Sequence, residues 1–263
     1  MLTRRVPCLL SLGLLGCMAL TCATPAEIST AQASEKQQTS EKQQTSSPAS
    51  PRDRYADELE RLNEKRTDLS ASLAKTKGKK KRARLYAKAR AAILEVVRDT
   101  VFPAWAGTAW DYNGTTKVPG EGHIACGYYV TTVLEQLGFK VQRAKLAQQA
   151  SERIIKTLVP ESNIWRFRKG DEEAVVAAIR EKGDGLYLVG LDNHTGFLDV
   201  RDDDVQFCHA SYVDPGVVTC EDATTAAAFQ SNYHVVGRLL TRDMLDPWLA
   251  GEAIATYEPD TSG

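Results

Sequence analysis

The spacing of apolar residues changes once along this 263-residue chain, near Gly183, and that change limits the folds it can adopt. Before Gly183, apolar residues recur at helical spacing in several segments. After it, short runs alternate apolar and polar residues and are separated by turn residues, as at Asp192-Asn193 and Asp214-Pro215-Gly216. Helices followed by strands that tight turns connect predict an α+β fold with an antiparallel sheet.

Each helical segment carries one apolar face. We expect helices over residues 53–74, 85–101, 125–137, 145–157 and 171–182. Pro103 should end the second helix and Gly138 the third. We expect strands over residues 186–191, 194–200, 205–212, 217–221 and 233–240.

Residues 1–22 have the pattern of an export signal. Arg4 and Arg5 precede an apolar run over residues 6–16 that is too short to span a membrane. Leu14-Leu15-Gly16-Cys17 then matches a bacterial lipobox, in which Cys17 becomes the lipidated N-terminus. The alternative is ordinary cleavage near Cys22, which would release a secreted or periplasmic protein. Both interpretations place the mature chain outside the cytoplasm, and the first makes it a membrane-anchored lipoprotein of the cell envelope.

The rest of the chain divides by composition into four parts. Residues 23–52 are polar, repeat the hexapeptide Ser-Glu-Lys-Gln-Gln-Thr, and predict a disordered tether. Residues 53–100 predict a helical, basic extension. Residues 101–245 hold the candidate catalytic domain, and residues 246–263 form a C-terminal tail.

Positive charge is concentrated within the extension. Residues 75–90 contain nine Lys or Arg and no acidic residue. This run indicates either a contact with an anionic polymer or membrane surface, or simply a solvated helical face. The whole chain has a net charge of -1, which gives no argument for a nucleic-acid partner. The sequence does not indicate an oligomeric state.

The cysteines of the mature region suggest one free thiol. Of six cysteines in the chain, three lie beyond the export region: Cys126, Cys208 and Cys220. Cys208 and Cys220 are each six residues from Asp214, the centre of a predicted hairpin. With a simple register they would face each other and form a disulfide in an oxidising compartment. The alternative is two buried thiols. In the first case Cys126 remains unpaired.

Cys126 is placed where a reactive thiol is expected. It begins the helix predicted over residues 125–137, so the positive end of the helix dipole should favour its thiolate. His194 and His209 follow in predicted strands and could supply a base and a group that orients the base.

A zinc site built from these residues is a poor match for the sequence. The chain has no Cys-x-x-Cys or His-x-x-x-His pair. Cys208 and His209 are successive residues of one strand and therefore point to opposite faces of the sheet. We expect neither a metal nor another cofactor.

Three segments resemble the NlpC-type cell-wall cysteine peptidases. They are Cys126-Gly-Tyr-Tyr-Val, His194-Thr-Gly-Phe-Leu and Val205-Gln-Phe-Cys-His209-Ala-Ser, within a resemblance that covers roughly residues 104–240. It implies a papain-like fold in which the helix that starts at the nucleophile packs on an antiparallel sheet. It also implies that Cys126 is the nucleophile, His194 the general base and His209 the group that orients it. The implied activity is cofactor-independent amide hydrolysis in the stem peptides of peptidoglycan.

The resemblance is looser upstream of Cys126. Trp110 stands where the family has a tyrosine that contacts substrate, and the Asp and Ser that flank the family's nucleophile are replaced by Ala125 and Gly127. The backbone N–H of Cys126, with a donor from Trp110 or Tyr112, would bind the oxyanion. Gly127 would leave space for substrate. The replacements leave two alternatives open: a papain-like amidase or acyltransferase with another substrate, and a non-catalytic lipoprotein that binds the envelope.

Overall fold

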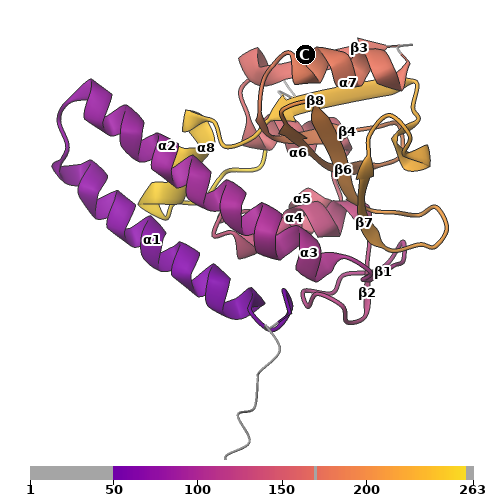
Figure 1. Ribbon diagram of the computed structural model, residues 1–263, viewed down its shortest axis with the longest axis horizontal. Coiled ribbons are helices and arrows are strands. Elements are labelled where there is room, and N and C mark those ends of the chain that lie inside the picture. The colour runs from indigo at the N-terminus through magenta and orange to yellow at the C-terminus, as the bar shows by residue number, and fades with distance from the viewer. Residues whose placement is uncertain (1–49, 169–170, 259–263) are drawn as a thin grey trace, which may run out of the picture. The chain divides into compact units, whose positions relative to one another are not determined.

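The computed structural model describes residues 50–168 and 171–258, which belong to one compact unit that runs from Ser46 to Gly263 (Figure 1). The helices are α1 (Tyr55–Lys75), α2 (Lys79–Val96), α3 (Phe102–Trp105), α4 (Cys126–Gln136), α5 (Arg143–Ala147), α6 (Ser151–Leu158), α7 (Glu172–Arg180) and α8 (Arg242–Ala250). The strands are β1 (Ala109–Trp110), β2 (His123–Ile124), β3 (Ile164–Arg168), β4 (Gly185–Gly190), β5 (Thr195–Arg201), β6 (Asp204–Ala210), β7 (Val218–Asp222) and β8 (Tyr233–Arg238). The export signal, the lipidation residue Cys17 and most of the tether lie outside the described residues.

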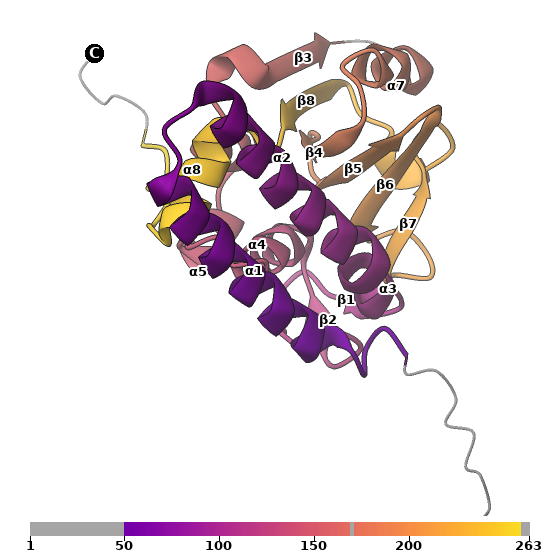
Figure 2. The ribbon, with the colours of Figure 1, turned by 60° about the vertical axis from the view of Figure 1, so that its left-hand side comes forward.

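The first two helices form an antiparallel pair, α1 beside α2 (Figure 2). Their contact follows from the apolar stripe of α1, in which Tyr55, Leu62, Leu69 and Leu73 are buried. Gly78 lies at the N-terminal boundary of α2 and separates the two helices. Most side chains of the basic run around it are exposed. Across the described part of the chain, no helix is both long enough and apolar enough to cross a bilayer.

The second helix does not end where Pro103 was expected to end it. Residues Val97–Val101 form a π-helical segment, and α3 then continues to Trp105. Pro103 lies in the first turn of α3, where the amide hydrogen that proline lacks is least needed. The prediction for Pro103 was therefore wrong because the helix changes its hydrogen-bonding period before the proline.

The main sheet is antiparallel, so the fold is α+β. Its six strands among the described residues have the order β3-β8-β4-β5-β6-β7, and every neighbouring pair is antiparallel. All five predicted strands are present. The edge strand β3 was not predicted, although Trp165 and Phe167 alternate with arginines there. A further short parallel pair, β1 with β2, lies upstream of α4.

Apolar side chains cover both faces of this sheet. Along β4, Leu188 faces one cluster and Val189 the other, as the period of two requires. The first cluster contains residues of α1, α2, α4, α6 and α8. The second contains Val175 and Ile179 of α7. Two covered faces explain why β4 is buried along its whole length.

The helical extension and the sheet share the first cluster. The Tyr55 hydroxyl of α1 donates a hydrogen bond to Gln136 of α4 and accepts one from the Trp105 indole. The sequence predicted that the candidate catalytic domain ends at residue 245 and that a C-terminal tail begins at residue 246. This boundary falls inside α8, a helix that was not predicted because Pro247 interrupts its pattern. Trp248 of α8 is buried and donates from its indole nitrogen to the carbonyl oxygen of Leu137. Residues 53–100 and α8 therefore belong to the same core as the sheet.

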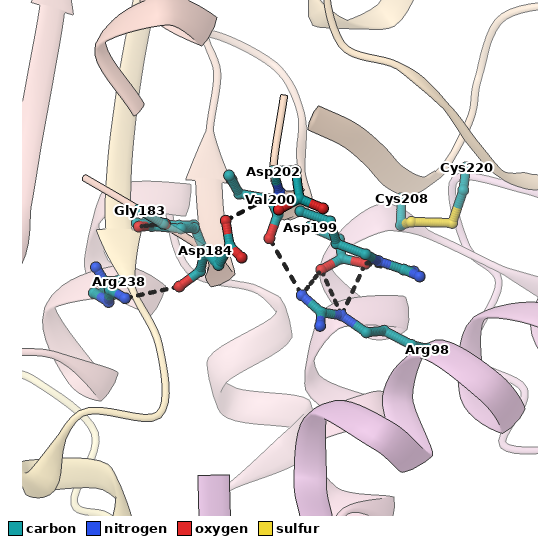
Figure 3. A network of polar contacts seen from close by, with 11 residues as sticks. Arg98, Gly183, Asp184, Asp199, Val200, Asp202, Cys208, Cys220 and Arg238 are labelled. Atoms are coloured by element: carbon teal, nitrogen blue, oxygen red, sulfur yellow. Dashed lines mark hydrogen bonds and ion pairs between the residues drawn. A yellow bond between two sulfur atoms is a disulfide. The ribbon is translucent and has the colours of Figure 1, made fainter. Parts of the chain in front are cut away.

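A buried ion pair links the π-helical segment to the sheet (Figure 3). The Arg98 guanidinium donates to Asp199 of β5, with 2.6 Å between Nη2 and Oδ1, and also to the carbonyl oxygen of Val200. Arg201 contacts the other oxygen of Asp199 at 2.7 Å. Asp199 is almost completely buried, so these arginines compensate the charge that burial would otherwise destabilise.

Candidate functional site

Cys126 begins α4 and carries a free thiol. It lines a pocket of about 180 Å³ that also contains His194. Three parts of the chain meet there: the start of α4, the α5–α6 connection and the turn between β4 and β5. The remaining lining residues are Gly127, Ala147, Gln149, Ala150, Ser151, Ile154, Leu191, Asp192, Asn193 and Thr195. The fold thus brings together a free thiol and a histidine that are far apart in sequence.

Burial determines the protonation state of the thiol. It raises the pKa of Cys126, whereas hydrogen bonds from the backbone N–H groups of Gly127 and Thr195 lower that pKa by a smaller amount. The expectation that the helix dipole would produce a resting thiolate is therefore not met. Cys126 rests as a neutral thiol, so any reaction through its sulfur needs a base to take the proton.

The raised pKa predicts slow alkylation of Cys126 at neutral pH. The rate of iodoacetamide modification should increase with a midpoint above the ordinary thiol pKa of about 8.5. Mass spectrometry of samples taken across a pH series would measure this rate, with Cys126→Ala as the unmodified control. A midpoint below neutral pH would contradict the buried, neutral thiol.

His194, His209 and Glu221 form a hydrogen-bonded row. His194 Nε2 lies 2.8 Å from His209 Nδ1, and His209 Nε2 lies 2.9 Å from Glu221 Oε1. The other ring nitrogen of His194, Nδ1, is buried without a hydrogen-bond partner among the described residues. No hydrogen bond joins it to Cys126, although both residues line one pocket.

Both histidines are neutral at physiological pH. Burial lowers the pKa of His194 and of His209, and the neighbouring His209 lowers that of His194 further. A neutral imidazole has a free lone pair, which a general base requires. The pocket therefore combines a protonated thiol with an unprotonated imidazole.

Aromatic packing and one glycine hold the histidine pair in place. Phe207 stacks on His209 with 4.0 Å between ring centroids, and Tyr212 lies edge-on to His194 at 5.1 Å. A Cβ atom on Gly196 would lie 2.6 Å from the Phe207 ring and 2.7 Å from the Cβ of His209. Residue 196 must therefore be glycine for His209 to occupy this position.

The disulfide lies on the opposite face of the same two strands. Cys208 pairs with Cys220 in the register of β6 and β7, and the two sulfurs are bonded. This is the arrangement that the symmetry about Asp214 predicts. Cys208 belongs to the first apolar cluster, whereas His209 stacks on Phe207 of the second, so successive residues do face opposite sides.

The aromatic residues proposed as oxyanion donors do not reach the pocket. Trp110 donates its backbone N–H to the carbonyl oxygen of Gly216, and its ring packs on Tyr212, 6.3 Å between centroids. Tyr212 in turn contacts His194, so the Tyr212 ring lies between Trp110 and the site. Tyr112 is 80% exposed. Neither Trp110 nor Tyr112 is among the residues that line the pocket.

Gly127 has a different role from the one expected. A Cβ atom at this position would lie 2.3 Å from the carbonyl oxygen of Ala147. The missing side chain therefore lets α5 approach α4, instead of leaving space for a substrate. Close packing of the two helices forms one wall of the pocket.

Sequence analysis missed Glu221 and Tyr212. Glu221 could have been found from the hairpin symmetry, since position 221 pairs with Phe207 and shares a face with His209. Tyr212 lies two residues beyond Ala210, the last residue of β6, in a connection for which the sequence alone gives no ring orientation.

The comparisons with known proteins give no family for this chain: no family model, no curated protein and no solved structure matches it. Within residues 50–168 and 171–258, no group of three or more His, Cys, Asp or Glu residues is arranged to hold a metal ion. The chemistry of the site is therefore the basis for assigning a function.

Proposed function

We propose that this protein is an exported cysteine hydrolase that cleaves amide bonds in peptidoglycan stem peptides, with a compact papain-like fold of the NlpC type. The observation that carries the proposal is the pocket that Cys126 and His194 line together, with His194 hydrogen-bonded through Nε2 to His209 and its Nδ1 without a partner among the described residues. A buried thiol with only a structural role would need neither a base nor a group that orients the base.

The proposed reaction starts with proton transfer from Cys126 to His194 Nδ1. The sulfur attacks the amide carbonyl carbon, and His194 returns the proton to the departing amine, which leaves a thioester on Cys126. Water, deprotonated by His194, then hydrolyses the thioester and restores the thiol. His209 holds the His194 ring in the orientation that both steps require.

Two further features support export and a peptide substrate. The disulfide between Cys208 and Cys220 is typical of proteins that fold in an oxidising compartment, as the export signal predicts. The pocket beside Cys126 is small and includes Ala147 and Ala150, so it suits short side chains. With lipid on Cys17, the tether of residues 23–52 would let an anchored enzyme reach nearby peptidoglycan.

A second candidate is an amidase or acyltransferase that acts on a different amide or ester. Ile154 and Leu191 give the same pocket an apolar side that could accept an aliphatic group. The Cys126 and His194 chemistry would be unchanged, because a thioester can be resolved by water or by another nucleophile.

Digestion of whole sacculi tests the first function. The full chain, with its disulfide formed, is incubated with purified sacculi, and the soluble products are analysed by mass spectrometry. We expect products cut at an amide within the stem peptide, and none from Cys126→Ala. If the protein hydrolyses generic thioester or ester substrates but leaves sacculi intact, the second candidate is favoured.

A further inference from the structure

The row of hydrogen bonds does not end at the histidine pair. Glu221 of β7 extends the row, with its Oε1 at 2.9 Å from His209 Nε2. Glu221 is partly exposed, with 39% of its side chain accessible, whereas His209 is fully buried. The carboxylate therefore stands between solvent and the buried imidazoles.

Each hydrogen bond in the row restricts the next one. An ionised carboxylate can only accept, so His209 Nε2–H must donate to Glu221. A neutral imidazole carries one ring proton, which leaves His209 Nδ1 as an acceptor. His194 Nε2–H must then donate to His209 Nδ1, and the lone pair of His194 falls on Nδ1, the nitrogen without a partner.

We infer that Glu221 is a positioning residue that makes His194 Nδ1 the basic nitrogen of the site. This inference rests on the proposed hydrolase mechanism, in which His194 accepts the thiol proton. It also gives Glu221 an electrostatic role, because its negative charge stabilises the imidazolium that forms when His194 takes that proton. A donor in place of the carboxylate would reverse both hydrogen bonds and put a proton on His194 Nδ1.

The strand register explains why Glu221 reaches His209. Glu221 pairs with Phe207, two residues from His209, and all three side chains lie on one face of the sheet. The neighbouring pair, Cys208 with Cys220, is covalently bonded on the other face. The disulfide thus fixes the register that holds the carboxylate against the imidazole.

The first test locates the protons on the histidine ring nitrogens directly and needs no substrate. Two-bond proton–nitrogen NMR spectra of the ¹⁵N-histidine-labelled full chain distinguish protonated from unprotonated ring nitrogens, and a His194→Asn variant assigns the His194 signals. We expect His194 to carry its proton on Nε2, with Nδ1 unprotonated. A proton on His194 Nδ1 in the wild-type protein would overturn the inference.

The second test uses three variants. Glu221→Ala removes the acceptor, Glu221→Gln keeps an acceptor oxygen without the charge, and Asp204→Asn removes an exposed carboxylate at the far end of β6 as a matched control. At pH 7 we expect Glu221→Ala to lower the rate of Cys126 alkylation, and kcat on a cleaved substrate, by about 10- to 100-fold with little change in KM. Glu221→Gln should recover part of this loss, and Asp204→Asn should behave as wild type.

The results separate the two proposals. An alkylation rate for Glu221→Ala within about twofold of wild type would overturn the role of Glu221. If the protein leaves sacculi intact, the alkylation rates and the NMR spectra still decide that role, because neither depends on which amide or ester is the substrate.

Discussion

Cys126→Ala is expected to abolish turnover and to leave the fold intact. Without the sulfur no thioester forms, and loss of a nucleophile from such a triad typically lowers kcat by about four orders of magnitude or more. Cys126 lines the pocket and is not part of the apolar core, so loss of its sulfur leaves that core unchanged. Mass analysis of sacculus digests, or release of amine from a model amide, would measure the effect.

Cys126→Ser provides the control for this variant. It keeps a hydroxyl of similar size beside His194, so a small residual rate would indicate that the base still operates. Circular dichroism and the thermal unfolding midpoint should be the same for wild type and both variants. Undiminished hydrolysis by Cys126→Ala would rule out the sulfur as nucleophile.

Arg98→Ala is expected to cause the largest loss of stability. Asp199 is 1% exposed, and removal of its partly buried partner Arg98 would leave a carboxylate charge poorly compensated (Figure 3). Breaking such a pair typically costs 3–5 kcal/mol, and we expect about 3 kcal/mol because Arg201 still contacts Asp199. Urea-induced unfolding followed by fluorescence would measure the change in the free energy of unfolding.

Arg201→Ala is the matched control. Arg201 pairs with the same carboxylate, but 49% of its side chain is exposed, compared with 19% for Arg98. A solvated pair of this kind contributes about 0–1 kcal/mol. If the two variants are destabilised equally, burial does not determine the strength of these ion pairs.

Most of the fold follows from local patterns in the sequence. The stripe from Tyr55 to Leu73 predicts α1, and alternation with turn signals predicts five strands of the main sheet. The remaining elements depend on distant partners. Strand β3 is short and lies at the sheet edge, where it pairs with β8, and α8 tolerates Pro247 because its apolar face packs on α1 and α2.

The candidate site also has features that the sequence predicts and features that it does not. The positions of Cys126, His194 and His209, and the pairing of Cys208 with Cys220, follow from spacing within recognisable segments. The protonation of the thiol could not be predicted, because it depends on how deeply α4 is buried. Whether Glu221 reaches His209 depends on side-chain geometry across a strand pair. The role of Gly127 depends on its close approach to α5, a helix that follows later in the chain.

The core shared by the helical hairpin and the sheet has an evolutionary consequence. Tyr55, Trp105 and Gln136 are joined by hydrogen bonds across three helices, and Trp248 closes the same core from the other end of the chain. Recombination that transferred the segment from Cys126 to Glu221 alone would carry the reactive groups but not the surfaces that support them. The unit that can be inherited as a folded whole is therefore longer than the segment that carries the candidate site, because it also includes α1 to α3 before Cys126 and α8 after Glu221.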